Sequence, residues 1–207
     1  MIAYVIAENP DDRILKQASQ ILRNGGLVCL PSDSNWVVLA DPFEKVGVDK
    51  LYRLRHVDNT KHFTIFCADI KQASDIATIN DVSFRFIKRY VPGPYTFIFP
   101  AQKMITRYLK ASRIDHQVGV RICALPLMKA LLAVHQGPAI GSHIDASMIA
   151  DHPEDLSIWA GLIEDNFGHA IEVILDPGEV EFLGPTTVVD LSGDEGPVVI
   201  REGVGPL

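Results

Sequence analysis

The segment LVCLPSDSNWVVLA, residues 27–40, contains two short apolar runs separated by Ser32, Asp33, Ser34 and Asn35. The two runs have the length and composition of buried strands, so the segment predicts strands at 27–31 and 36–40. Turns are usually built from Gly, Asn, Asp or Ser and place few constraints on a neighbouring Trp. Two hydroxyls and a carboxylate at a strand end therefore leave two interpretations open, a turn and a set of ligand contacts.

Outward from this segment, helices and apolar strands alternate along the chain. Asn9 is predicted to cap a helix that ends at Asn24-Gly25-Gly26, and Asp69 and Asn80 are predicted to cap two others. Further helices are predicted at about 43–54, 103–110, 126–134 and 153–167. The remaining predicted strands lie at 3–7, 63–67, 95–101, 119–123, 138–142, 171–175, 186–191 and 197–201, with a weaker one at 180–183.

This alternation predicts an α/β fold, and the strand-rich end of the chain favours a mixed parallel and antiparallel sheet. No linker is long enough to separate two domains, so we expect one domain over residues 1–207.

The composition is that of a folded soluble protein, with 47% apolar and 22% charged residues. No apolar run approaches the roughly 20 residues of a membrane-spanning helix, and the acidic amino terminus does not resemble a signal peptide. We therefore expect a cytoplasmic protein without a membrane partner. Cys29, Cys67 and Cys123 lie in apolar runs and are predicted to be reduced core thiols. No compact histidine or cysteine spacing indicates a metal site.

The net charge of −7 hides an uneven distribution. Residues 45–129 carry fifteen Lys and Arg against six Asp, a net of +9, whereas the remainder carries −16. A cationic segment in an acidic protein points to an anionic ligand. The alternative is that these charges solvate helix faces and pair with the acidic remainder.

Several polar residues lie where a predicted strand begins or ends, which is where ligands bind in open α/β sheets. Besides Ser32, Asp33 and Ser34 of the opening segment, they are Lys61, His62, Thr64, Ser142, His143, Thr186, Thr187 and Arg201. Hydroxyls and cations predominate in this set, which suits a phosphate or a carboxylate ligand. Arg121 lies inside an apolar strand and needs an anionic partner, either an internal acid or a ligand. No Walker A, Rossmann or G-x-S-x-G motif is present.

The ordered set of motifs resembles the YrdC/Sua5/YciO family, and most closely its YciO-type branch. The motifs are PSDSNW at 31–36, LYRLR at 51–55, KHFT at 61–64, PGPYT at 92–96, GVR at 119–121, GPTTVVDL at 184–191 and IREG at 200–203. They extend over about residues 10 to 205. The resemblance implies a single YrdC-like α/β domain with a twisted, open, mixed sheet, flanking helices and a positively charged concave face.

The resemblance also implies an activity, that of a threonylcarbamoyl-AMP synthase. Such enzymes join ATP, L-threonine and bicarbonate into threonylcarbamoyl-adenylate and pyrophosphate, for the threonylcarbamoyl-adenosine modification of tRNA. ATP with Mg would be a substrate, and no tightly bound cofactor is implied. Double-stranded RNA is a further partner implied by the family.

Site residues follow from the resemblance by position. It implies a threonine side formed by Ser32, Ser34, Trp36, Arg55, Thr64 and Ser142. It implies a nucleotide side formed by Arg55, Lys61, Ser142, Thr186 and Arg201, with Lys61 and Arg121 as the catalytic cations.

Two positions depart from the family pattern. The arginine of the Lys-x-Arg motif is Val57 here, and the asparagine of the Ser-x-Asn motif is Ile144. Each lost charge-assisted hydrogen bond typically costs roughly 1.5–3 kcal/mol. Two hypotheses therefore stand: a synthase that is slow or has an altered substrate, and a nucleotide- or double-stranded-RNA-binding module without efficient catalysis.

Overall fold

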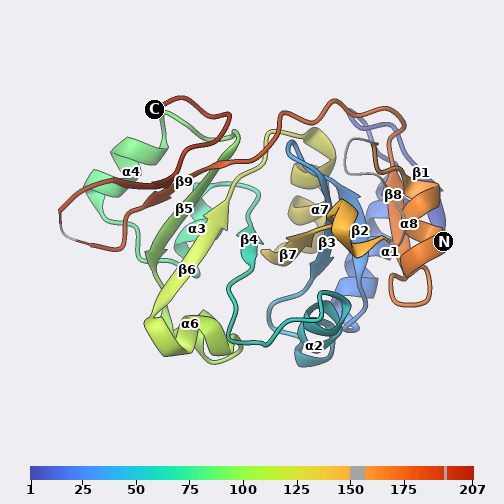
Figure 1. The fold of residues 1–207 in the computed structure, drawn as a ribbon, viewed down its shortest axis with the longest axis horizontal. Helices are drawn as coiled ribbons and strands as arrows, with labels where there is room; N and C mark the ends of the chain where they lie inside the picture. Colours follow the sequence, from blue (N-terminus) through green and yellow to red (C-terminus); the bar gives the residue numbers. More distant parts are fainter. Residues whose placement is uncertain (150–156, 194) are drawn as a thin grey trace.

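The computed structural model describes residues 1–149, 157–193 and 195–207, and in these residues ten strands form one open sheet (Figure 1). The strand order is β1-β8-β2-β3-β7-β4-β6-β5-β9-β10. Neighbouring strands are parallel at β1–β8, β8–β2, β4–β6 and β5–β9, and antiparallel at the other junctions. The predicted α/β domain with a mixed open sheet is confirmed.

The predicted strands lie close to their observed positions. The observed strands are β1 (Ile2–Tyr4), β2 (Val28–Pro31), β3 (Trp36–Ala40), β4 (Thr64–Phe66), β5 (Tyr95–Pro100), β6 (Gln117–Arg121), β7 (Ala139–His143), β8 (Val173–Asp176), β9 (Thr187–Asp190) and β10 (Val198–Arg201). The weaker strand predicted at 180–183 does not form, because this segment runs between the two halves of the sheet and is not paired as a strand.

The helices flank the sheet and are mostly short. They are α1 (Asp12–Arg23), α2 (Lys45–Leu54), α3 (Ile70–Ser74), α4 (Asp81–Ile87), α5 (Lys103–Thr106), α6 (Lys110–Asp115), α7 (Pro126–His135) and α8 (Ala160–Phe167), with a 3-10 turn at Ala146–Met148. Among the described residues, no helix combines the length and apolar character that crossing a membrane requires.

Three helix boundaries differ from the sequence-based predictions. The N-cap of α1 is Asp11 and not Asn9, since the Asp11 carboxylate accepts a hydrogen bond from the Arg13 backbone N–H at 2.7 Å. The helix predicted near 103–110 is two short helices, α5 and α6. The last helix begins at Ala160, so residues 157–159 are not helical, and residues 153–156 of that prediction lie outside the described residues. The predicted N-caps of α3 and α4, Asp69 and Asn80, are confirmed.

The sheet has a hydrophobic layer on each face. On one face, α1 and α7 pack together over the half that contains β2, β3 and β8, through residues such as Leu22, Leu131 and Val173. On the other face, a larger cluster joins the sheet to α2, α4, α5 and α8, through residues such as Leu51, Ile87 and Ile163.

One face of the sheet is partly exposed to solvent at β5, β6 and β9. Along β5, Tyr95, Phe97 and Phe99 are buried, whereas Thr96 and Ile98 on the opposite face are only partly buried. The same alternation leaves Gly119 of β6 and Val188 of β9 partly exposed beside them. This partly exposed surface, which we name the open face, adjoins Thr186, whose hydroxyl lies 3.1 Å from that of Thr96.

The C-terminal segment is hydrogen-bonded to β5 and β9 by side chains on the face opposite the open face. The Tyr95 hydroxyl donates to the Pro206 carbonyl at 2.6 Å, and the Thr187 hydroxyl donates to the Gly205 carbonyl at 2.7 Å. A Cβ on Gly203 would lie 2.3 Å from the Pro185 carbonyl oxygen, so only glycine permits this close approach.

Two glycines of neighbouring strands give a matched test of the packing. A Cβ at Gly141 would lie 2.7–2.9 Å from side chains of Leu39, Phe66 and Val37, whereas at Gly119 it would meet only Thr96 at 3.8 Å. We expect Gly141→Ala to lower the free energy of unfolding by about 1–3 kcal/mol through overpacking. Gly119→Ala should leave it unchanged or raise it by up to about 1 kcal/mol. Urea denaturation measures both, and equal effects would contradict the packing described for β7.

Candidate functional site

The turn between β2 and β3 is organised by the hydroxyl of Ser32. Its Oγ donates to the Asn35 carbonyl at 2.8 Å and accepts from the backbone N–H groups of Ser34 and Asn35, each at 3.3 Å. Ser32 is fully buried, so its hydroxyl holds the turn. Ser34 is only partly buried and is the hydroxyl of this pair that faces the other site residues.

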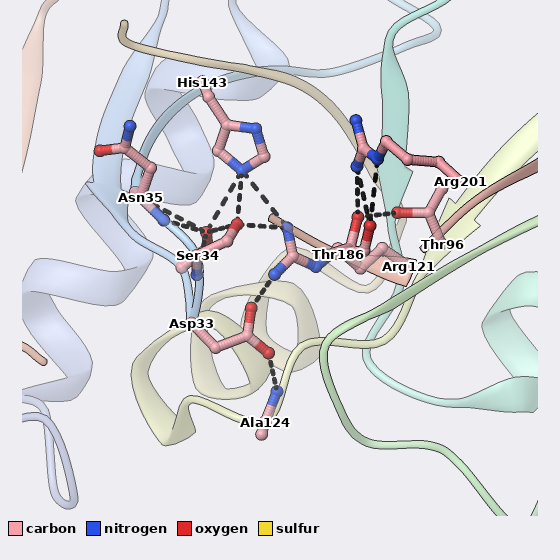
Figure 2. A network of polar contacts seen from close by, with 10 residues as sticks. Asp33, Ser34, Asn35, Thr96, Arg121, Ala124, His143, Thr186 and Arg201 are labelled. Atoms are coloured by element: carbon pink, nitrogen blue, oxygen red, sulfur yellow. Dashed lines mark hydrogen bonds and ion pairs between the residues drawn. The ribbon is translucent and has the colours of Figure 1, made fainter. Parts of the chain in front are cut away.

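Arg121, at the end of β6, is the centre of a polar cluster that we name the Arg121 cluster (Figure 2). Its Nη2 forms a short ion pair with Asp33 Oδ1, and its Nη1 donates to Ser34 Oγ at 2.8 Å. Asp33 Oδ2 accepts in turn from the Ala124 backbone N–H at 3.4 Å. The question that the sequence left open is therefore decided: the anionic partner of Arg121 is an internal acid.

The Arg121 side chain is 1% exposed and lies over the ring of Phe66, with 5.5 Å between the guanidinium carbon and the ring centroid. Burial lowers the pKa of Arg121 to about 10, and the nearby charge of Arg201 acts in the same direction. Arg121 is thus charged at neutral pH, and Asp33 compensates most of that charge.

His143, the last residue of β7, completes the cluster. Its Nε2 lies 3.1 Å from Ser34 Oγ, 3.3 Å from Arg121 Nη1 and 3.4 Å from Ser32 Oγ. Burial lowers the pKa of His143 to about 4, and the positive charges of Arg121, Arg55 and Arg201 lower it further against the opposing effect of Asp145. The imidazole is therefore neutral at physiological pH.

Arg55 holds the end of β7 from the other side. Its Nη2 pairs with Asp145 Oδ2 at 2.8 Å, and its Nη1 donates to the His143 carbonyl at 3.0 Å and contacts the Met148 sulfur. Like Arg121, this cation has an internal carboxylate partner.

A second cluster adjoins the first at the edge of the open face (Figure 2). Arg201 donates to the Thr186 carbonyl at 2.9 Å and to its hydroxyl at 3.1 Å, and that hydroxyl lies 3.1 Å from the hydroxyl of Thr96. Arg201 is exposed, and no salt bridge to it occurs within the part of the chain that the structure describes. It is the cation of the two clusters best placed to meet an anionic ligand.

The structure brings together only part of the residue set expected from the sequence. Ser34 contacts both Ser32 and Arg121, Arg55 joins them through His143, and Thr186 and Arg201 form the adjoining cluster. Thr64 opens β4 and lies opposite Gly141 of β7.

Lys61, Ser142 and Trp36 lie outside the two clusters. Lys61 is exposed on the loop before β4, where its carbonyl accepts from the Tyr52 hydroxyl at 2.7 Å. Ser142 is buried opposite Val38, and strand alternation directs its side chain to the face opposite that of His143. Trp36 is 3% exposed and donates from Nε1 to the Ile158 carbonyl at 2.8 Å.

Three contributors to the site had no role assigned from the family resemblance: Asp33 and His143, which were recognised from the sequence only as polar residues at strand ends, and Thr96. Asp33 lies inside the PSDSNW motif, and the arginine in an apolar strand was the signal that an anionic partner, either an internal acid or a ligand, was required. His143 directly follows Ser142 at a strand end, but only the alternation of β7 shows which of the two faces Ser34.

The two positions that depart from the family pattern are apolar contacts in this structure. Ile144 is fully buried in the larger hydrophobic cluster, and Val57 is partly buried and packs against it. No grouping of three or more His, Cys, Asp or Glu side chains that could hold a metal ion occurs among residues 1–149, 157–193 and 195–207.

The chain belongs to the Sua5/YciO/YrdC family. A family model of that name, described as "Telomere recombination", matches residues 20–203. The chain is 31% identical over 209 residues to the uncharacterized protein YciO of Escherichia coli (strain K12), a match that covers 99% of this chain and 96% of YciO. The crystal structure of E. coli YciO superposes with a TM-score of 0.84 and covers 100% of this chain and 97% of YciO.

More distant relatives carry a functional name. A putative threonylcarbamoyl-AMP synthase of Methanocaldococcus jannaschii is 22% identical, over 99% of this chain and 92% of that protein. The structure of P. abyssi Sua5 complexed with L-threonine matches with a TM-score of 0.82 at 23% identity, over 97% of this chain and 57% of Sua5. At this identity the likeness to Sua5 establishes the fold.

Removal of Asp33 should be far more destabilising than removal of Asp145. Asp33→Ala leaves the buried charge of Arg121 without its partner, which we expect to lower the free energy of unfolding by about 3–5 kcal/mol. Asp145 is 49% exposed, so Asp145→Ala should cost about 1 kcal/mol or less. Chemical denaturation of the two variants at pH 7 measures the difference. Equal losses of unfolding free energy would contradict a larger contribution from the buried pair.

Acid should destabilise the protein through His143. Because its pKa falls from 6.5 in the unfolded chain to about 4 in the fold, the unfolded state binds the proton more readily between these values. This contribution to stability is fully present above pH 6.5 and is lost as the pH falls toward 4. We expect the wild-type protein to lose about 2 kcal/mol more than His143→Gln between pH 7 and pH 4.5. Urea unfolding at the two pH values measures this, and parallel losses would contradict it.

Proposed function

We propose that this protein is a synthase of the threonylcarbamoyl-AMP type, using ATP, L-threonine and bicarbonate. In this reaction the threonine amine and bicarbonate form a carbamate with loss of water. A carbamate oxygen then attacks the α-phosphorus of ATP, and pyrophosphate leaves with its Mg. The product would supply a threonylcarbamoyl group for tRNA modification.

The observation that carries this proposal is that the Arg121 cluster, with its serine hydroxyls, adjoins the exposed cation Arg201 and Thr186. Ser34 and Arg121 offer groups that orient a small polar substrate, and Arg201 with Thr186 offers donors for a phosphate or an adenylate. The chemistry needs no nucleophilic side chain, since positioning and electrostatic stabilisation can supply it. Family membership and relatives named as such synthases support the same activity.

Lys61 is assigned to the triphosphate in this proposal. It is exposed on a loop held by two contacts: the Tyr52 hydroxyl donates to the Lys61 carbonyl, and His62 Nε2 lies 2.6 Å from Asp115 Oδ2. A lysine at the end of a flexible four-carbon stem can turn toward a bound phosphate.

A second candidate function is nucleotide or double-stranded RNA binding without efficient synthesis. Two observations favour it: Arg55 and Arg121 already have carboxylate partners, and Val57 and Ile144 offer no donor. These features together lower the number of unpaired donors that a triphosphate would meet.

The deciding experiment incubates the purified protein with ATP, Mg, bicarbonate and labelled L-threonine. The synthase proposal predicts pyrophosphate release that depends on threonine and yields a labelled adenylate, and a reaction without threonine is the control. Absence of turnover together with RNA binding that weakens steeply with salt would replace the synthase by the second candidate.

Restoring the arginine that the family has at position 57 should raise the affinity for ATP. Val57 is partly buried, and an arginine there can keep its stem against the core while its head reaches solvent. We expect Val57→Arg to tighten ATP binding by about tenfold or more, as one charge-assisted contact does.

Two further variants control for this gain. Val57→Met, which adds bulk without charge, should leave ATP affinity unchanged, and Lys61→Ala should reduce it. Isothermal titration calorimetry measures the ATP affinity of all three variants. An equal gain in affinity for Val57→Arg and Val57→Met would show that the added charge is not its cause.

A further inference from the structure

The hydrogen-bond geometry around His143 determines which of its ring nitrogens carries the proton. Nε2 faces Arg121 Nη1 at 3.3 Å, and an arginine N–H can only donate. Nε2 must therefore present its lone pair to Arg121. The hydroxyl of Ser34, 3.1 Å away, is then oriented to donate to the same atom, because its oxygen already accepts from Arg121.

The surrounding charges keep the ring neutral. The guanidinium groups of Arg121, Arg55 and Arg201 approach from β6, the end of α2 and β10, and all three disfavour a second positive charge. Asp145, on the loop after β7, acts in the opposite direction but is paired with Arg55. The Asp33 carboxylate is held by Arg121. A neutral ring whose Nε2 accepts carries its hydrogen on Nδ1.

This leaves a donor that has no acceptor among the described residues. Within residues 1–149, 157–193 and 195–207, the hydrogen bonds of the His143 ring all involve Nε2, as Figure 2 shows. In the same part of the chain, the Nε–H of Arg121 is buried and has no partner. His143 Nδ1 is not one of the buried atoms without a partner, and His143 is only partly buried, so an acceptor group of a ligand can reach this N–H.

We propose that His143 is a substrate-contacting residue, fixed as the neutral Nδ1–H tautomer and donating this N–H to a carboxylate oxygen. The inference rests on the proposed function for the identity of the ligand, in which the oxygen belongs to the threonine carboxylate. A carboxylate fits better than a phosphate, because the cluster offers a neutral donor and a cation whose charge Asp33 largely compensates. Phosphate groups are better served by the exposed Arg201 at the adjoining edge.

The tautomer can be measured directly. Nitrogen-15 NMR of the labelled wild-type protein at pH 7 should show His143 with a protonated Nδ1 and an unprotonated Nε2. Its Nδ1–H signal should shift when L-threonine is added. A protonated Nε2 would overturn the inference, whatever the enzymatic activity of the protein.

Two variants separate the donor from the acceptor of the ring. The amide of Asn places an N–H near the position of Nδ1, whereas the longer amide of Gln places its oxygen near Nε2. We expect His143→Gln to preserve the contacts to Arg121 and Ser34 and to weaken L-threonine binding by about tenfold to a hundredfold. His143→Asn should bind L-threonine within about threefold of wild type, because one good donor replaces another.

The comparison ligand is L-threoninol, which has a hydroxymethyl group in place of the carboxylate. We expect L-threoninol to bind weakly to the wild type and equally weakly to His143→Gln. The variant therefore loses only the preference for L-threonine over L-threoninol. Wild-type affinity of His143→Gln for L-threonine would overturn the contact.

Pyrophosphate is the second probe, and it separates this inference from the proposed function. A shift of the Nδ1–H signal with pyrophosphate but not with L-threonine would overturn the carboxylate assignment. No shift with either probe would overturn the contact altogether. The synthase activity is judged independently by threonine-dependent pyrophosphate release, which can fail while the tautomer and the contact hold.

Discussion

The buried ion pair between Asp33 and Arg121 is the constraint on which the site depends. Asp33 comes from the turn between β2 and β3, and Arg121 from the end of β6, so the pair joins the two halves of the sheet. Between these halves the sheet continues through β4, which is only three residues long. Asp33 also accepts a hydrogen bond from the Ala124 N–H, which follows β6, and its carbonyl accepts from the Leu183 N–H at 2.8 Å, in the segment that connects β8 to β9.

The same pair explains why the cluster has a fixed geometry. Two charges taken out of water need good geometry and further hydrogen bonds to offset their desolvation. Asp33 supplies them by accepting from Ala124, and Arg121 by donating to Ser34 and His143. The positions of the Ser34 hydroxyl and the His143 ring are therefore set by what the arginine requires. The cluster is thus organised by contacts within the protein itself.

Local signals in the sequence were sufficient for most elements and for one key residue. The strands at 27–31 and 36–40 and the caps at Asp69 and Asn80 depend on nearby residues, so the pattern predicted them correctly. Arg121 stood out because a charge inside an apolar strand requires a partner. That this partner is Asp33 depends on how segments that are distant in the sequence meet in space, and no local sequence pattern carries that information.

The positions of the Lys61 and Ser142 side chains could not be predicted from the sequence, for two different reasons. Lys61 lies on a loop whose course is set by tertiary contacts with Tyr52 and Asp115. Ser142 and His143 are adjacent in one strand and must face opposite sides, and the sequence did not indicate which side carries the cluster. The start of α8 at Ala160 is likewise a boundary that the pattern placed too early.

The distribution of charge leads to a different view of the site from the one that composition suggests. Of the basic residues in 45–129, Arg55 and Arg121 lie in the Arg121 cluster, and each has a carboxylate partner. Others in the same segment, such as Lys103, Arg107, Lys110 and Arg113, are exposed on α5 and α6 or beside them. The positive net charge of the segment is therefore largely a property of helix surfaces. At the cluster itself, a neutral histidine, hydroxyls and compensated cations act through the direction of their hydrogen bonds, which favours selection of a ligand by geometry over attraction by net charge.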